Sequence, residues 1–267
     1  PAQVQIRDQT ILRISVMNCS DDGINGPGLS VAEEIASKLG EEVWTVAPDA
    51  DCSGGSRQIN LHKPLRLKQY GDTKFSVSGS PADCVMLGVG EVMKGIDIDL
   101  VISGVNAGVN IGGDVGFSGT VGAAMTADVL GVPGVALSQA WKERQNIPWD
   151  SSRVWLPKIL ELLIQNDMWP WNFIPNINVP SVSPGDVVGA RISNQGRSTH
   201  VAPAIEKRVD LRQQEYFWLY ISKEHSQPAD DEDIAVLRNG EISVTPLTRS
   251  ITDHVASNRL KSIFSNI

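Results

Sequence analysis

The sequence of 267 residues contains few cysteines: only Cys19, Cys52 and Cys84 are present. Three widely spaced cysteines form neither an even disulfide framework nor a CxxC metal motif. Such sparing use of cysteine is typical of a reducing compartment. We therefore expect a cytoplasmic protein.

The sequence also lacks a block of lysine or arginine, and its formal net charge is −8. A nucleic-acid polymer is therefore not an expected partner. A phosphate ester can still bind an acidic protein, provided that a metal or backbone N–H groups supply positive potential. No apolar run approaches the length of a membrane span, and residues 1–10 are polar without the apolar core of a signal peptide. We expect no membrane partner.

Apolar runs alternate with helical patterns through the first two thirds of the chain. Between the predicted strands 11–17 and 43–47, apolar residues recur at helical spacing from Leu29 to Leu39. The same patterns predict further strands at 61–67, 75–78, 98–102, 132–138 and 176–180, and helices that begin at 81, near 118 and at 153. This order predicts an α/β fold with a mostly parallel sheet.

The character of the chain changes after residue 185. We predict only strands and loops there, at residues 187–193, 216–221 and 241–245, followed by a short helix within 251–267. The acidic run at residues 230–233 is interpreted as a solvated loop.

Asp21 and Asp22 follow the first predicted strand, where its helix is about to begin. Ligands of open α/β sheets bind at this edge. Adjacent carboxylates repel each other and raise each other's pKa, so a pair kept together in a loop usually serves a cation. A turn that caps the helix is the alternative, and the pair alone does not decide between the two.

Ser53, Asn106 and the triplet Ser118-Gly119-Thr120 are expected at the same edge. Carboxylate, hydroxyl and amide oxygens favour Mg²⁺, Mn²⁺ or Ca²⁺ over zinc. The triplet at a helix N-terminus offers free N–H groups to a phosphate, and Gly119 allows a close approach. A divalent cation beside an anion site suits hydrolysis of a phosphate ester, because the metal can generate hydroxide and offset charge.

Each of these motifs also has a purely structural interpretation. Ser53 is more often a turn residue, and Asn106 and Asn110 more often close a tight loop by backbone hydrogen bonds. Ser118 is a common helix cap. The glycine-rich residues 104–113 could instead bind a dinucleotide, but no GxGxxG follows the first strand.

In their number, order and spacing, these motifs resemble those of the SurE (stationary-phase survival protein) family of metal-dependent 5′-nucleotidases. The resemblance covers roughly residues 11–254. It rests on SDDG…GPG at 20–28, AP…SG at 47–54, GSPADC at 79–84, SGVNAGVN at 103–110, SGTVGAAM at 118–125, NINVP at 176–180 and SVTPL at 243–247, which match the family motifs NDDG…APG, APxxxxSG, GTPxDC, SGxNxGxN, SGTVxAAM, NINVP and SITPL.

The resemblance implies a Rossmann-like, mostly parallel sheet with helices on both faces, plus a C-terminal β-rich elaboration and tail. Residues 1–184 would form the catalytic domain, and residues 185–267 the elaboration and oligomerisation tail. A homodimer or homotetramer with exchanged C-terminal elements is also implied.

The resemblance further implies nucleoside 5′-monophosphates as substrates, hydrolysed to nucleoside and phosphate. One divalent cation per subunit is expected, Mg²⁺ or Mn²⁺, with Ca²⁺ as a possible non-activating occupant. The expected metal ligands are Asp21, Asp22, Ser53 and Asn106, of which Asp21, Asp22 and Asn106 would be catalytic. The expected phosphate-binding residues are Asn110, Ser118, Gly119 and Thr120.

Four positions depart from the family pattern. Ser20 stands where the family has Asn, Phe117 where Tyr is common, Thr126 where Glu is usual and Ser250 where Asp is usual. These departures leave the expected metal ligands in place. Ser20, Phe117 and Thr126 motivate the alternative of a nucleotide-binding homologue with weak or lost catalysis.

Five tryptophans lie within residues 141–171, at 141, 149, 155, 169 and 171. Apolar aromatic clusters more often mark packing or contacts than ligands. We therefore interpret this segment as core packing or a subunit interface, with base stacking as the less favoured alternative.

Overall fold

The computed structural model describes residues 12–17, 23–166, 168–197, 199–225 and 227–264. Its central sheet is built from β1 (Leu12–Met17), β2 (Gly40–Pro48), β3 (Leu67–Gly71), β4 (Lys74–Val77), β5 (Leu100–Ala107), β6 (Gly134–Gln139), β7 (Ile174–Val179), β8 (Gly189–Ile192) and β11 (Glu241–Leu247). In space the order is β3-β4-β2-β1-β5-β6-β7-β11-β8. The six strands from β4 to β7 run parallel, whereas β3 and β11 run antiparallel to β4 and β7. The predicted mostly parallel α/β sheet is confirmed.

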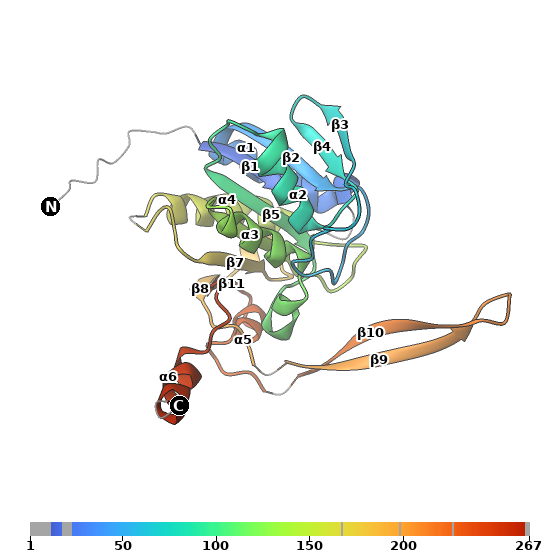
Figure 1. The fold of residues 1–267 in the computed structure, drawn as a ribbon. Helices are drawn as coiled ribbons and strands as arrows, with labels where there is room; N and C mark the ends of the chain where they lie inside the picture. The colour runs from blue at the N-terminus through green and yellow to red at the C-terminus, as the bar shows by residue number, and fades with distance from the viewer. Residues whose placement is uncertain (1–11, 18–22, 167, 198, 226, 265–267) are drawn as a thin grey trace.

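Helices cover both faces of this sheet (Figure 1). One face carries α1 (Pro27–Leu39) and α4 (Trp149–Ile164), and the other carries α2 (Pro81–Leu87) and α3 (Gly119–Val129). Helix α5 (Asp233–Arg238) precedes β11, and α6 (His254–Phe264) lies away from the sheet (Figure 1). The short turns are η1 (Gly23–Asn25), η2 (Gly88–Val92), η3 (Gly112–Gly116) and η4 (Pro184–Asp186). On β5, Leu100 and Ile102 pack in one core cluster with α1 and α4, and Val101 packs in another with α2 and α3. Neighbouring strand residues face opposite sides, so a continuous apolar run is buried on both.

Three predicted boundaries in this region are wrong. The strand expected at 61–67 begins only at Leu67, and the preceding Leu61 is exposed. The helix expected from residue 153 already begins at Trp149. Strand β5 runs five residues past its predicted end and therefore contains Asn106, because Asn106 and Ala107 pair with Ser138 and Gln139 of β6 after an irregularity at residues 104–105.

After residue 185 the expectation of strands and loops alone is also wrong, because α5 lies there. The acidic run is only partly a solvated loop: Asp233 is buried, and its carboxylate accepts N–H groups of Gly112, Gly196 and Ile234 at 2.8–3.0 Å. Burial raises the pKa of Asp233, and these three hydrogen bonds oppose that rise only in part. The predicted C-terminal helix is confirmed by α6.

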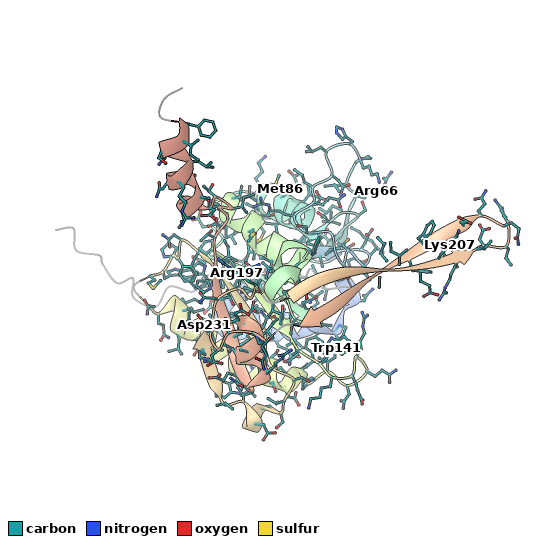
Figure 2. The ribbon with its side chains drawn as sticks, turned by 90° about the horizontal axis from the view of Figure 1, so that it is seen from below. Arg66, Met86, Trp141, Arg197, Lys207 and Asp231 are labelled. Carbon is teal, nitrogen blue, oxygen red and sulfur yellow. The ribbon has the colours of Figure 1, made fainter. Side chains whose placement is uncertain are left out.

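A long two-stranded arm leaves the body of the molecule in the same region. It consists of β9 (Thr199–Val209), which the sequence pattern did not predict, and the antiparallel β10 (Glu215–His225). Figures 1 and 2 show the arm extending away from the sheet and its helices. Strands β8 and β11 instead extend the central sheet, and the division of the chain at 184/185 stays a prediction. Among the described helices, none is both long and apolar enough to cross a membrane.

Candidate active site

The segment after β2 carries Ser53 to the carboxyl edge of the sheet. Asp51 Oδ1 accepts the Ser53 N–H at 2.8 Å, which closes a tight turn around the serine. Three residues later, Ser56 donates its N–H to the Phe117 carbonyl at 3.0 Å and its hydroxyl to the Gly116 carbonyl at 2.8 Å. These bonds dock the Ser53 turn against the chain that leads into α3.

The N-terminus of α3 lies beside that turn. Ser118 caps the helix, because its Oγ accepts the Val121 N–H at 3.0 Å. The first N–H groups of a helix have no partner within it, so the amides of Gly119 and Thr120 are available to an anion. A Cβ on Gly119 would lie 3.0 Å from Pro81 Cγ. Close packing against α2 is therefore a second reason for glycine here, beside the expected approach of an anion.

Asn106 reaches the edge at the end of β5, where it pairs in register with Ser138 of β6. Its Nδ2 donates to the Gly108 carbonyl at 3.1 Å. This bond fixes the orientation of the amide and directs Oδ1 away from Gly108. The side chain thus offers an oxygen, the atom that a hard cation prefers.

Asn110 is held by two neighbouring strands. Its Nδ2 donates to Ser138 Oγ on β6 at 2.8 Å, and its N–H donates to Asn178 Oδ1 on β7 at 2.8 Å. Its carbonyl accepts the Nδ2 groups of Asn176 and Asn178 at 2.8 and 3.2 Å. Asn176 and Asn178 lie two apart on a strand and so share a face. They position Asn110, a role that motif reading did not assign to them.

One cavity of about 500 Å³ brings the expected residues together. Six of the eight line it: Ser53, Asn106, Asn110, Ser118, Gly119 and Thr120. Asp21 and Asp22, like Ser20, lie outside the described residues. Among the described residues, no group of three or more His, Cys, Asp or Glu side chains could hold a metal by itself.

A second cavity of about 390 Å³ shares Ser53 and includes Cys52. The Cys52 thiol donates to the carbonyls of Ala50 and Gly79, each at a distance of 3.5 Å. Burial, and then the charge of nearby carboxylates with Asp51 foremost, raises the pKa of this thiol. A raised pKa favours the protonated thiol, which is the less nucleophilic form.

The cavity at the sheet edge also includes Trp141, which motif reading assigned to packing or an interface. The other four tryptophans of that segment behave as expected. Trp171 is 5% exposed within the core, and Trp149, Trp155 and Trp169 pack against the same core cluster. Sequence periodicity could not separate Trp141 from these, because its place depends on the loop that follows β6.

The fold and this edge define the class of protein: an open α/β protein with a cavity, lined by serine, threonine and asparagine among others, at the carboxyl ends of its parallel strands. Comparison with known proteins names the family. The model of the family "Survival protein SurE" matches residues 16–202. The chain belongs to the SurE family.

Individual relatives agree with this assignment. The chain is 43% identical over 246 residues to the 5′-nucleotidase SurE of Brucella canis, covering 91% of this chain and 94% of that protein. It is 40% identical over 256 residues to the 5′-nucleotidase SurE of Methylobacterium radiotolerans, covering 95% and 100%. The crystal structure of the SurE protein from Aquifex aeolicus superposes with a TM-score of 0.79 at 29% identity, covering 94% of this chain and 99% of that one.

Proposed function

We propose that the chain is a divalent-metal-dependent phosphomonoesterase that hydrolyses nucleoside 5′-monophosphates to nucleosides and phosphate. Its curated relatives carry the name 5′-nucleotidase SurE. The observation that carries the proposal is the single cavity in which Ser53, Asn106 and the N-terminus of α3 meet. The relatives do not favour the alternative of a homologue without catalysis. Thr126, which stands where the family usually has Glu, has a local structural contact: its hydroxyl donates to the Gly122 carbonyl at 2.7 Å inside α3.

The donor set fits one hard divalent cation. Asp21, Asp22, Ser53 and Asn106 offer carboxylate, hydroxyl and amide oxygens, which suit Mg²⁺ or Mn²⁺, and Ca²⁺ could occupy the same ligands without activating. The hydrogen bond from Asn106 to the Gly108 carbonyl supports this fit, because it leaves Oδ1 for a ligand role. A bound divalent cation supplies charge neutralisation and activation of water in phosphate-ester hydrolysis.

The protein's own groups bind and orient the substrate. The amides of Gly119 and Thr120 donate to phosphoryl oxygens, aided by the positive end of the α3 dipole. Ser118 Oγ accepts from Val121 and keeps its own proton for donation to the phosphate. Asn110 is held rigidly by β6 and β7, so its position against the phosphate needs no rearrangement. One of the two aspartates accepts the proton of the attacking water.

Phosphate release tests this proposal. We expect release from nucleoside 5′-monophosphates with Mg²⁺ or Mn²⁺, and loss of release with EDTA. Asp21→Asn should abolish metal-dependent hydrolysis, because one ligand charge is lost, while the exposed Asp72→Asn in the turn between β3 and β4 serves as the matched control. Near-normal turnover by Asp21→Asn would contradict the assignment.

We also infer that the chain assembles as a homodimer or homotetramer through the arm and the tail. Large apolar side chains are exposed on both segments: Ile205, Phe217, Trp218 and Leu219 on the arm, and Val255, Leu260, Ile263 and Phe264 on α6. An isolated two-stranded hairpin is marginally stable in water. Contact with a second copy would bury these side chains and exchange C-terminal elements between subunits.

A cytoplasmic location completes the proposal. Within the described chain, Cys52 and Cys84 take part in no disulfide. Free thiols persist in a reducing compartment. Fractionation of the native host cells tests this placement.

A further inference from the structure

The cavity at the sheet edge has an aromatic wall that phosphate chemistry does not need. Trp141 follows β6 by two residues and lines the same cavity as Asn106 and the N-terminus of α3. Its side chain is 38% exposed, unlike the buried Trp171. Figure 2 shows Trp141 on the body of the molecule, on the side from which the arm projects.

The indole is fixed in place before any ligand arrives. Its Nε1 donates to the Ala107 carbonyl at 3.0 Å, and the preceding Ala140 N–H donates to the Val179 carbonyl at 2.8 Å. A Cβ on Gly108 would lie 3.8 Å from Nε1, so the ring lies against that glycine. A ring that is already oriented loses little conformational entropy when a ligand binds to it.

We propose that Trp141 is the base-stacking residue of the site: the nucleobase lies against its indole while the phosphate lies at the N-terminus of α3. This inference rests on the proposed function and adds the group that recognises the nucleoside. A cavity of about 500 Å³ lies within the range that holds small ligands. Every base has a π face, so stacking on one indole accepts several bases.

Phe117 also lines the cavity but fits this role less well. It directly precedes the capping Ser118, so it belongs to the segment that holds the phosphate. A ribose separates the phosphate of a nucleotide from its base. The base-binding ring should therefore come from a different strand end, as Trp141 does.

The test compares two substrates that differ by the base. We would measure kcat/KM for adenosine 5′-monophosphate and for ribose 5-phosphate with the wild type, Trp141→Ala, Trp141→Phe and Phe117→Ala. The ratio of kcat/KM for adenosine 5′-monophosphate to kcat/KM for ribose 5-phosphate should fall about 5- to 150-fold in Trp141→Ala. This is the usual loss when a stacking ring is removed. Trp141→Phe keeps an aromatic face and should retain most of the ratio. Lys142→Ala, the neighbouring exposed position, should leave the ratio unchanged.

Several results would overturn the proposal. A ratio within twofold of the wild type in Trp141→Ala would exclude stacking. An equal loss for both substrates would show a structural role through the Ala107 carbonyl. A change in molecular mass by light scattering would show that Trp141 is an interface residue, and a fall in the ratio for Phe117→Ala alone would assign the base to Phe117.

Binding of adenosine separates failure of this proposal from failure of the proposed function. If the wild type releases phosphate from neither substrate with either metal, the proposed activity fails. Calorimetry with adenosine then decides the stacking: affinity about 5- to 150-fold lower in Trp141→Ala supports it. Equal affinity of the two proteins, or no binding to the wild type, overturns it.

Discussion

The central sheet and the β9–β10 arm use similar apolar residues in opposite ways. Val135 and Leu137 of β6 are fully buried, whereas Phe217 and Leu219 of β10 are 56% and 75% exposed. Burial of apolar surface stabilises a fold by about 25 cal/mol per Å², so the sheet gains this stabilisation within one chain. The difference teaches that the body buries its apolar strands within one chain, while the arm would gain comparable stabilisation only from the proposed partner copy.

The two regions are nevertheless joined at one buried carboxylate. Asp233 accepts the N–H of Gly112, just after the expected phosphate-binding residue Asn110, and the N–H of Gly196, just before β9. The base of the arm is thereby tied to the loop that forms the cavity. If subunits assemble through the arm, as proposed, assembly and the geometry of the site would be physically connected at this point.

The largest effect is expected for substitutions on the arm, which should weaken the proposed assembly and leave the body folded. Ile205, Phe217 and Leu219 share one face of the hairpin, because Ile205 pairs with Leu219 and Phe217 lies two residues away. Changing all three to serine removes apolar surface that the assembly would bury. The free energy of association should become less favourable by about 5 kcal/mol, so the dissociation constant should rise about a thousandfold or more. Light scattering should then report the single-chain mass of 28.9 kDa.

The matched control for that triple variant is Met86→Ser, an exposed apolar residue of α2 on the body. It should leave the mass unchanged. The thermal unfolding of the body should be close to that of the wild type in both variants. An unchanged mass in the triple variant would show that the arm does not hold the assembly.

The same contrast explains what the sequence predicts and what it does not. The buried parallel strand at 132–138 is mostly apolar, and the strand at 176–180 alternates asparagine with Ile177 and Val179, so the positions of both are predictable. Strand β9 contains Pro203 and the charged residues 206–208, and its exposed face leaves no alternating pattern to detect. Helix α5 was missed because its acidic start is typical of a solvated loop, and only the fold buries Asp233.

The site was predictable to a similar degree. Six expected residues line one cavity because the carboxyl ends of parallel strands share an edge. Their individual roles stay predictions. Trp141 could not be placed in advance, since its position depends on the hydrogen bond to the Ala107 carbonyl, and Asn178 was recognisable only as part of a strand.

An intermediate effect is expected within the body, at Asp83. This carboxylate is 3% exposed and accepts the N–H and Nδ2 of Asn60 at 2.9 and 2.6 Å and the N–H of Ser80 at 2.8 Å. Asp83→Ala removes charge-assisted bonds and half of a capping box, so the free energy of unfolding should fall by about 2–4 kcal/mol. Urea denaturation measures it, with the exposed Asp72→Ala as the control expected within about 0.5 kcal/mol. A loss below about 1 kcal/mol in Asp83→Ala would contradict this role.

The pH dependence of stability follows from the same carboxylate. Burial alone would raise the pKa of Asp83, but the hydrogen bonds from Asn60 and Ser80 outweigh it and hold the pKa below its usual value. Because the folded pKa lies below the unfolded one, the stabilisation is present above the unfolded pKa and is lost as pH falls through the folded pKa. Asp83→Asn should therefore flatten the decline in stability on the acid side. Asp233, whose pKa is raised, contributes a slope of the opposite sign.

The smallest effect is expected for an ion pair on the arm. Lys207 Nζ lies 2.5 Å from Glu215 Oε1, yet both side chains are more than half exposed. Exposed pairs contribute about 0–1 kcal/mol, and salt screens them. A double-mutant cycle of Lys207→Met and Glu215→Gln should give a coupling energy below about 0.5 kcal/mol at physiological salt. A coupling above about 1.5 kcal/mol would mean that this pair is buried in the assembly, and the arm would then be stabilised through its charged tip region as well as through its apolar face.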